Sequence, residues 1–340
     1  MRLSALSTWH GGLTLLEHGG NLGAAASEYG IPLQQWLDLS TGINPHGYPV
    51  PAIPAELWQR LPLQEDGLTA AAKAYYGAEH LLPTAGSQAI IQSLPLLRPA
   101  CRVSLCGTTY NEHAHSWRRQ GHQVAYFDRI PDSAMLEHTD VLVICNPNNP
   151  TGQRIATDTL LDWHAQLSAR GGWLVIDEAF MDSTPENSLA GHAHLPGLFI
   201  LRSLGKFFGL AGTRVGFLLA QESRLRQLEE LLGPWTVSGP SRHIAKMALL
   251  DREWQKINRT RLEAGSERML TLLKQYGLSP QGRTALFLWV PTGDAIAWHV
   301  HLARHGIWTR LYRDWSALRF GLPDDAGWAK LEHALASFNR

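Results

Sequence analysis

The stretch "VLVICNPNNPTG", residues 141–152, joins a run of five apolar residues to asparagines, prolines and a glycine. The apolar run is rich in β-branched residues and ends in turn residues, so it predicts a buried strand. Two later runs end in the same way: "WLVID" (173–177) leads into Glu178, and "LFIL" (198–201) leads into "RSLGK" (202–206). An amide cluster, a carboxylate and a lysine therefore follow three consecutive predicted strands.

Helical stretches alternate with these strands. "RVSLC" (102–106) and "QVAYF" (123–127) predict two more strands with a helix between them, and a further helix begins at Gly86 and Ser87. The stretch from 157 to 172 predicts a helix with Thr157 or Asp158 as N-cap and Gly171 as its stop. Strand–helix–strand units in series predict an α/β fold, with a mostly parallel sheet and helices on both faces.

The remaining chain divides into an arm and a second domain. Five prolines in residues 45–62 indicate an extended connector, and after about residue 240 a long amphipathic helical region leads to an α+β segment. We therefore predict an N-terminal arm (1–45) that contributes to the small domain and the active site, a large domain (46–235) and a small domain (236–340).

Composition narrows the class of protein. Thirty acidic and thirty basic residues balance among 340, which argues against nucleic-acid or membrane partners. The start of the chain has no sustained apolar segment, and three cysteines fit neither a zinc pattern nor a disulfide framework, so we predict a cytoplasmic protein. Sixteen histidines show no HExxH spacing, and no metal site is predicted.

The three strand ends indicate a chemistry. In open α/β sheets ligands bind beyond the carboxyl ends of the strands, so these polar residues should meet. Pyridoxal phosphate needs a lysine for its aldehyde, a carboxylate for its pyridine nitrogen and a donor for its phenolic oxygen. Its phosphate needs backbone N–H groups and an arginine. Apolar surroundings would keep Lys206 partly unprotonated, which suits a nucleophilic amine.

The set "NPNNPTG…DEAF…SLGKFFGLAGTRVG" resembles the class I and II aminotransferase superfamily, the fold-type I pyridoxal phosphate enzymes. The resemblance implies a seven-stranded, mostly parallel sheet between helices, a smaller α+β domain and a homodimer with sites completed across the interface. It implies that Lys206 forms the Schiff base, that Asp177 bonds the pyridine nitrogen and that Asn149 bonds the phenolic oxygen. It also implies that Tyr110 stacks on the cofactor ring, although Tyr110 could instead be a structural tyrosine of the core. It further implies a phosphate site made by Gly86, Ser87, Ser203 and Arg214.

The chain departs from the family pattern at two of these motifs. Many relatives carry tyrosine where this chain has Phe180, which removes one hydrogen bond to the phenolic oxygen. Many carry serine or threonine at the position of Gly205, so the phosphate has one hydroxyl contact fewer here and depends more on Ser203 and Arg214. Neither change affects the Schiff-base lysine.

The N-terminal segment "LEHGG…DLSTGINPHG" resembles the threonine-phosphate decarboxylases of cobalamin biosynthesis, a branch close to the histidinol-phosphate aminotransferases. This resemblance implies decarboxylation of O-phospho-L-threonine to (R)-1-aminopropan-2-yl phosphate. Relatives often have asparagine at the position of Gly42. The implied substrate-binding residues are His18, Gly19, Gly42, Asn149, Arg310 and Arg319. For the two arginines, the alternative is that each forms an ion pair at the surface.

Other functions stay open at this stage. A histidinol-phosphate-type aminotransferase would use the same residues, because the bond broken is the one held perpendicular to the ring, and the sequence does not fix which bond that is. A cofactor-binding sensor without catalysis is a second alternative. A nucleotide-binding Rossmann enzyme is disfavoured because no GxGxxG follows a predicted strand.

Overall fold

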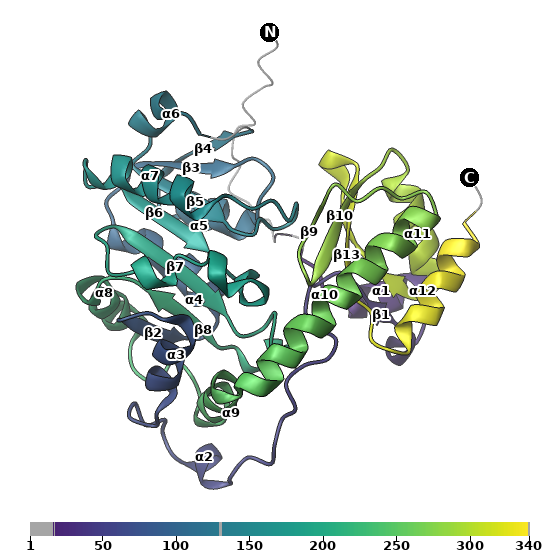
Figure 1. Cartoon of the computed structure of the whole chain (residues 1–340), viewed down its shortest axis with the longest axis horizontal. Coiled ribbons are helices and arrows are strands. Elements are labelled where there is room, and N and C mark those ends of the chain that lie inside the picture. The colour runs from purple at the N-terminus through teal and green to yellow at the C-terminus, as the bar shows by residue number, and fades with distance from the viewer. Residues whose placement is uncertain (1–15, 17, 129–130, 339–340) are drawn as a thin grey trace.

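The large sheet has seven strands and carries the predicted strand ends at one edge. The computed structural model describes residues 16, 18–128 and 131–338 (Figure 1). The strand order is β2-β8-β7-β6-β5-β3-β4, and β8 runs opposite to the other six strands. The prediction of a mostly parallel seven-stranded sheet is confirmed. The strands are β2 (Leu81–Thr84), β3 (Arg102–Cys106), β4 (Gln123–Phe127), β5 (Val141–Cys145), β6 (Trp173–Asp177), β7 (Leu198–Ser203) and β8 (Gly216–Leu219).

Helices cover both faces of this sheet. Successive side chains of a strand point to opposite faces, and in β5 Val141 and Val143 pack with one set of helices while Leu142 and Ile144 pack with the other. The first set is α4 (Ser87–Ser93), α5 (Asn111–Arg119) and α8 (Glu222–Leu232). The second set is α3 (Leu68–Tyr76), α6 (Ser133–Glu137), α7 (Thr157–Ser168) and α9 (Gly239–Leu250).

Helix α7 begins at Thr157, one residue earlier than a predicted N-cap at Thr157 would allow. The N-cap is Ala156, which has extended backbone (ψ 145°) and makes no side-chain capping bond. The predicted N-cap at Thr157 or Asp158 is therefore wrong. The Thr157 hydroxyl instead donates to the Asn187 carbonyl at 3.4 Å, so a tertiary contact takes the group that a cap would use. Gly171, at φ +69°, follows the helix end as predicted.

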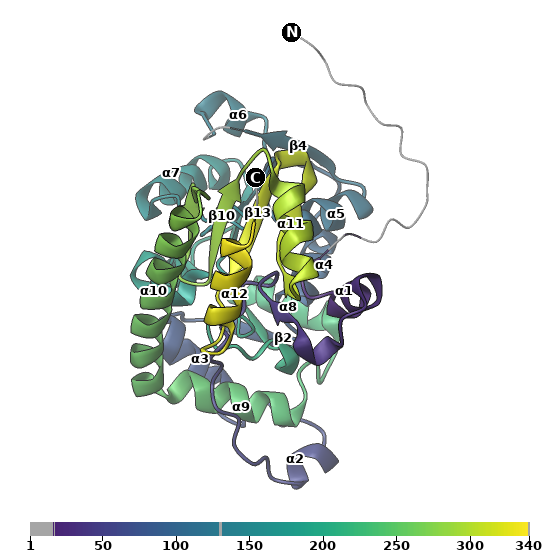
Figure 2. The ribbon, with the colours of Figure 1, turned by 90° about the vertical axis from the view of Figure 1, so that its right-hand side faces the viewer.

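A second, antiparallel sheet follows in the order β12-β13-β10-β9. The predicted helical region splits at Asp251, whose side chain accepts from the Trp254 N–H and so caps α10. Helices α10, α11 and α12 lie on the face of this sheet that is turned away from the large sheet (Figure 2). The elements are α10 (Arg252–Gln275), β9 (Gly282–Arg283), β10 (Phe287–Pro291), α11 (Ala295–Arg304), β12 (Arg310–Tyr312), β13 (Ala317–Gly321) and α12 (Gly327–Ala336).

The N-terminal arm ties the two sheets together. After α1 (Leu22–Tyr29), β1 (Leu37–Asp38) pairs in parallel with β11 (Ile307–Trp308), beside the small sheet. Residues 44–48, which we name the strap, then cross the loop that holds Lys206. The Asn44 N–H donates to the Lys206 carbonyl at 3.0 Å, and the Tyr48 N–H donates to the Phe208 carbonyl at 2.8 Å.

The connector that follows is extended except for α2 (Glu56–Gln59). The predicted domain boundaries stay a prediction, and the segment 1–15, on which the absence of a signal segment was predicted, lies outside the described residues. In the described part of the chain, none of the helices combines the length and the apolarity that crossing a bilayer would require.

Candidate active site

Lys206 lies in the loop after β7 with its amine among apolar groups. Its Nζ is 3.4 Å from the Thr41 carbonyl oxygen and 5.4 Å from the centre of the Phe180 ring. Burial, followed by the positive charges of Arg319 and Arg214, lowers the pKa of Lys206 to about 8, although Asp177 opposes the shift. A substantial fraction of the amine is therefore neutral near physiological pH and can act as a nucleophile.

Asp177 ends β6 and is held by two hydrogen bonds. Its Oδ1 accepts from the Ala179 N–H at 3.0 Å, and its Oδ2 lies 2.9 Å from His113 Nε2. Burial opposes a charge on His113, but hydrogen bonds to Asp177 and Cys145 raise its pKa to about 10. The pair is therefore a buried ion pair at the floor of the site. No role for His113 was predicted from the sequence, although it stands one helical turn after Tyr110 at the same sheet edge.

His113, Cys145 and Asp177 also have ligand atoms within 4.8 Å of one another, close enough to share a metal ion. The sequence patterns predict no metal site. His113 and Asp177 already bond each other, so a metal would have to break that pair. We assign the trio to the floor of the candidate site, beneath Lys206.

The predicted phosphate-binding residues meet where β2 and β8 pair. Thr84 of β2 is opposite Gly216 of β8, which brings Gly86 and Ser87 beside the loop that ends in Arg214. A Cβ on Gly86, which has φ +75°, would come within 2.6 Å of Arg214 Nη2. Only glycine leaves room for the guanidinium here. Arg214 itself adopts φ 52°, an uncommon conformation for a residue with a side chain.

Ser203 and Tyr110 complete this side of the site. Ser203 ends β7 beside Gly216. A Cβ on Gly205 would lie 3.1 Å from the Ala211 Cα, so close backbone packing accounts for the glycine where relatives have a hydroxyl. Tyr110 caps α5 at the end of the β3 segment, with its ring centre 6.1 Å from those of His113 and His18. Burial raises the pKa of Tyr110, so its hydroxyl stays neutral.

Arg319 connects the small sheet to the large one. Its Nη1 donates to Asn149 Oδ1 and its Nη2 donates to the Ser40 carbonyl. Its buried Nε has no hydrogen-bond partner among the described residues. Arg310 is directly opposite Arg319 in the β12–β13 pair, so both side chains leave the same face of the sheet. Like charges placed opposite each other are unfavourable unless an anion binds between them.

Two more of the predicted substrate residues, His18 and Gly19, lie in the same cavity as Arg310, and Gly42 lies against the rings of Phe180 and Phe287. His18, Gly19 and Arg310 line a cavity of about 600 Å³ between α1 and β12, together with His299 and others. His18 Nε2 is 2.8 Å from Glu112 Oε1. Gly19 packs so closely on the Ser40 carbonyl that a Cβ would lie 2.3 Å from its oxygen.

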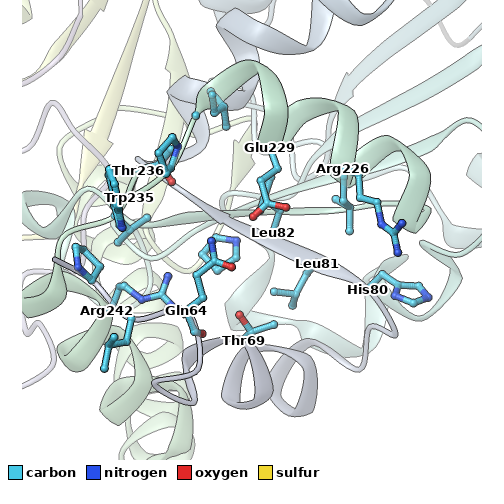
Figure 3. A pocket seen from close by; sticks show the side chains of 18 of the residues that line it. Gln64, Thr69, His80, Leu81, Leu82, Arg226, Glu229, Trp235, Thr236 and Arg242 are labelled. Atoms are coloured by element: carbon cyan, nitrogen blue, oxygen red, sulfur yellow. Dashed lines mark hydrogen bonds between the residues drawn. The ribbon is translucent and has the colours of Figure 1, made fainter.

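A second cavity lies outside this constellation. It has a volume of about 300 Å³ and lies along the edge strand β2 between α3, α8 and the start of α9 (Figure 3). Its lining includes His80, Arg226, Trp235 and Arg242 but none of the predicted site residues. We therefore locate the chemistry between the two sheets.

The residues between the sheets fit pyridoxal phosphate by their chemistry. A partly neutral amine, a carboxylate, an amide and a buried arginine nitrogen that has no hydrogen-bond partner within the described part of the chain converge there, beside a glycine cradle that holds a second arginine. These groups would hold an aldehyde, a pyridine nitrogen, a phenolic oxygen and anionic groups.

Comparison with known proteins gives three informative similarities. The sequence profile of the family "Aminotransferase class I and II" matches residues 59–320. A "Threonine-phosphate decarboxylase" of Pseudomonas aeruginosa is 52% identical over 95% of this chain and 98% of its own length. Another from a Sinorhizobium species is 43% identical over 94% of this chain and 97% of its own.

Among solved structures, the histidinol-phosphate aminotransferase from Sinorhizobium meliloti in complex with pyridoxal-5'-phosphate is similar in fold. Its TM-score is 0.82 at 20% identity, and the match covers 98% of this chain and 97% of that one. An identity this low supports the fold only.

Proposed function

Because this chain belongs to the class I and II aminotransferase family, we propose from that premise that it is a pyridoxal phosphate-dependent carboxy-lyase. It decarboxylates O-phospho-L-threonine to (R)-1-aminopropan-2-yl phosphate and CO2, a step of cobalamin biosynthesis. The observation that carries this proposal is the near full-length identity of 52% and 43% to threonine-phosphate decarboxylases. Fold alone would not separate the reactions of this family.

Each residue of the cofactor site then has a role. Pyridoxal phosphate, when bound, supplies a conjugated system that accepts the electron pair of the broken bond. Lys206 binds the aldehyde, Asp177 bonds the pyridine nitrogen, and Asn149 bonds the phenolic oxygen. His113 supports Asp177 as a positioning residue. Tyr110 stacks on the ring, and the phosphate is held by Gly86, Ser87, Ser203 and Arg214.

The two arginines bind the anionic groups of the substrate. Arg319 contacts Asn149, the residue proposed for the phenolic oxygen, so it lies nearer the reacting carbon and holds the carboxylate. Arg310 lies toward the cavity lined by His18 and Gly19 and holds the phosphate there. Gly42 lies against the rings of Phe180 and Phe287. Fork-shaped guanidinium groups suit both anions.

The proton balance follows from Lys206. With the cofactor bound, the substrate amine would displace the Lys206 amine, which would then be available beside Cα to move a proton. The bond from Cα to the carboxylate breaks, CO2 leaves, and one proton is returned to Cα by Lys206 or by water. No oxidation occurs, so no 2-oxo acid is consumed.

The decisive experiment is incubation of the holoenzyme with O-phospho-L-threonine. We expect CO2 and the amino phosphate in equal amounts, without added 2-oxoglutarate. Lys206→Ala should lose both this activity and the visible absorption of the lysine-bound cofactor. Turnover that requires 2-oxoglutarate would instead identify a histidinol-phosphate-type aminotransferase, and a bound cofactor without turnover would identify a sensor.

Two finer properties belong to this proposal. The family resemblance implies a homodimer, which light scattering tests as twice the mass of 37.7 kDa. The substrate is a small phosphorylated amino acid, consistent with a cytoplasmic location.

A further inference from the structure

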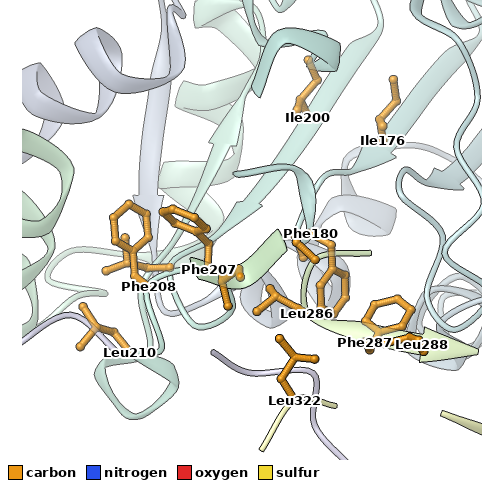
Figure 4. Packing of buried hydrophobic residues seen from close by; sticks show 14 of the residues in the cluster. Ile176, Phe180, Ile200, Phe207, Phe208, Leu210, Leu286, Phe287, Leu288 and Leu322 are labelled. Atoms are coloured by element: carbon orange, nitrogen blue, oxygen red, sulfur yellow. The ribbon is translucent and has the colours of Figure 1, made fainter. Parts of the chain in front are cut away.

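Two positions at which the chain departs from its family pattern touch each other. A Cβ on Gly42, which has φ +62°, would lie 3.3 Å from Phe180 Cε1 and 3.3 Å from Phe287 Cδ1. The rings of Phe180 and Phe287 pack edge to face with their centres 4.9 Å apart, and both are buried (Figure 4). We name Gly42, Phe180 and Phe287 the apolar wall.

The apolar wall contacts the two cations that the reaction uses. Lys206 Nζ is 5.4 Å from the centre of the Phe180 ring, and Arg319 Cζ is 5.2 Å from the centre of the Phe287 ring. The wall's side chains offer no hydrogen-bonding group. The reacting amine and the carboxylate-binding arginine therefore share one hydrocarbon surface, made by three segments that are distant in sequence.

We propose that the apolar wall determines reaction specificity by favouring loss of CO2 over transfer of the Cα proton. This inference rests on the proposed function and assigns a role to Gly42, Phe180 and Phe287 within it. Phe180 and Phe287 are specificity-determining residues, and Gly42 leaves the space that lets the rings reach the site.

The first reason is the fate of the carboxylate charge. In decarboxylation the Cα–carboxylate bond breaks, its electron pair moves into the conjugated system, and a neutral CO2 is left. Arg319 pairs with the carboxylate, but the apolar wall adds no polar contact of its own, so the carboxylate is less well solvated there than in water, whereas neutral CO2 carries no such penalty. The wall therefore favours the step that removes this charge from its surface.

The second reason is the fate of the proton in the competing reaction. Transamination requires the neutral amine of Lys206 to take the proton from Cα, and the electron pair of the Cα–H bond enters the same conjugated system. Lys206 then becomes an ammonium ion against the wall in the bond-breaking step itself, whereas the Cα–carboxylate bond breaks without a proton transfer to Lys206. Desolvation disfavours that ion, and the Phe180 ring face offsets only part of the cost.

A hydroxyl placed on the wall tests the proposal. Phe180→Tyr adds one polar group to the wall, and Phe180→Leu is its apolar counterpart. With O-phospho-L-threonine as substrate and 2-oxoglutarate present to accept the amino group, the holoenzyme is assayed for the 2-oxo acid formed from the substrate per CO2 released. We expect Phe180→Tyr to raise this ratio about tenfold or more, and Phe180→Leu to keep it within about threefold of the wild type.

A second measurement uses protein without cofactor. The pH dependence of amine labelling at Lys206 gives its pKa, which should be about 8 in the wild type. We expect Phe180→Tyr to raise this pKa by about one unit and Phe180→Leu not to raise it. Phe287→Tyr, with the hydroxyl on the other ring, replaces Phe180→Tyr if that variant does not fold, as judged by circular dichroism.

The outcomes separate the two proposals. An unchanged product ratio in both tyrosine variants, or an equal rise in Phe180→Leu, overturns the role of the wall. Absence of CO2 release by the wild type overturns the proposed function instead. The labelling measurement still reports in that case whether the wall controls the amine.

Discussion

Arg202 stands one residue before Ser203, and its guanidinium is buried between two carboxylates. Its Nη1 donates to Glu178 Oε2 and its Nη2 donates to Asp182 Oδ1, each at 2.6 Å. Glu178 in turn follows Asp177. One buried cation therefore joins the ends of β6 and β7, from which Asp177 and the Lys206 loop project.

We expect Arg202→Met to lower the free energy of unfolding by about 3–5 kcal/mol, because both carboxylates remain buried without their partner. Denaturant unfolding measures the change. Arg226→Met is the matched control: its pair with Glu222 lies on the exposed face of α8, so its midpoint should not move. Equal shifts in the two variants would contradict the buried role.

His299 gives a prediction for pH dependence. Its Nδ1 lies 2.8 Å from Thr309 Oγ1, and burial, with the positive charges of Arg313 and Arg310, lowers its pKa to about 4. The folded pKa lies below the unfolded value of about 6.5. The resulting stability is therefore complete above pH 6.5 and is lost as the pH falls toward 4, by up to about 3 kcal/mol.

His299→Gln removes this titration. Thermal midpoints of the variant and the wild type, measured from pH 7.5 to 4.5, should diverge in slope, with the steeper fall in the wild type. Parallel curves would mean that His299 keeps its ordinary pKa in the folded protein.

At the scale of elements, the strap and the Lys206 loop depend on two glycines in contact. Gly209 has φ +66°, and a Cβ there would lie 2.5 Å from the Gly47 Cα and 2.9 Å from the Asn44 carbonyl oxygen. Any side chain at 209 must push the strap away from the lysine loop. The strap therefore controls the position of Lys206.

We expect Gly209→Ala to weaken pyridoxal phosphate binding by about tenfold and to lower the thermal midpoint. Gly212→Ala in the same loop is the matched control, because nothing in the described part of the chain lies within 4 Å of a Cβ there. Cofactor titration by absorbance measures the affinity. A Gly212→Ala protein as weakened as Gly209→Ala would show that the loop, and not the strap, is responsible.

The sequence predicted these elements unevenly, for physical reasons. Strands β5, β6 and β7 were identifiable because long apolar runs end abruptly in polar residues. Strands β2 and β8 were not, because each has four residues, and Pro83 interrupts the pattern of β2. The prediction of the α7 N-cap was wrong because the sequence does not show that the Thr157 hydroxyl bonds a distant residue instead of capping the helix.

At the scale of the whole molecule, the sequence predicted the lysine, the carboxylate and the asparagine of the candidate site but not the contacts that support them. His113 reaches Asp177 across 64 residues, because β3 and β5 are neighbours and α5 returns over the sheet. The family resemblance did not single out that pair. The contacts between the two sheets were equally hidden, since Arg319 meets Asn149 at a separation of 170 residues.

Asn258 links helix α10 of the predicted small domain to the strap and to the Lys206 loop of the predicted large domain. From α10 its Nδ2 donates to the Phe207 carbonyl at 3.2 Å, and its Oδ1 accepts from Asn44 Nδ2 at 3.0 Å. Asn44 Nδ2 also reaches the Phe207 carbonyl at 2.8 Å. Helix α10, the strap and the residue after Lys206 therefore share one buried hydrogen-bond network.

We expect Asn258→Ala to lower stability by about 1–3 kcal/mol, because a buried amide loses its partner. Cofactor affinity should fall as well, since the same network holds the Lys206 loop. Thr260→Ala, on the exposed side of α10, should change neither quantity. Denaturant unfolding with and without pyridoxal phosphate measures both. If Asn258→Ala lost stability at unchanged cofactor affinity, α10 would stabilise the fold without reaching the site, and other contacts, such as that of Arg319 with Asn149, would couple the two sheets.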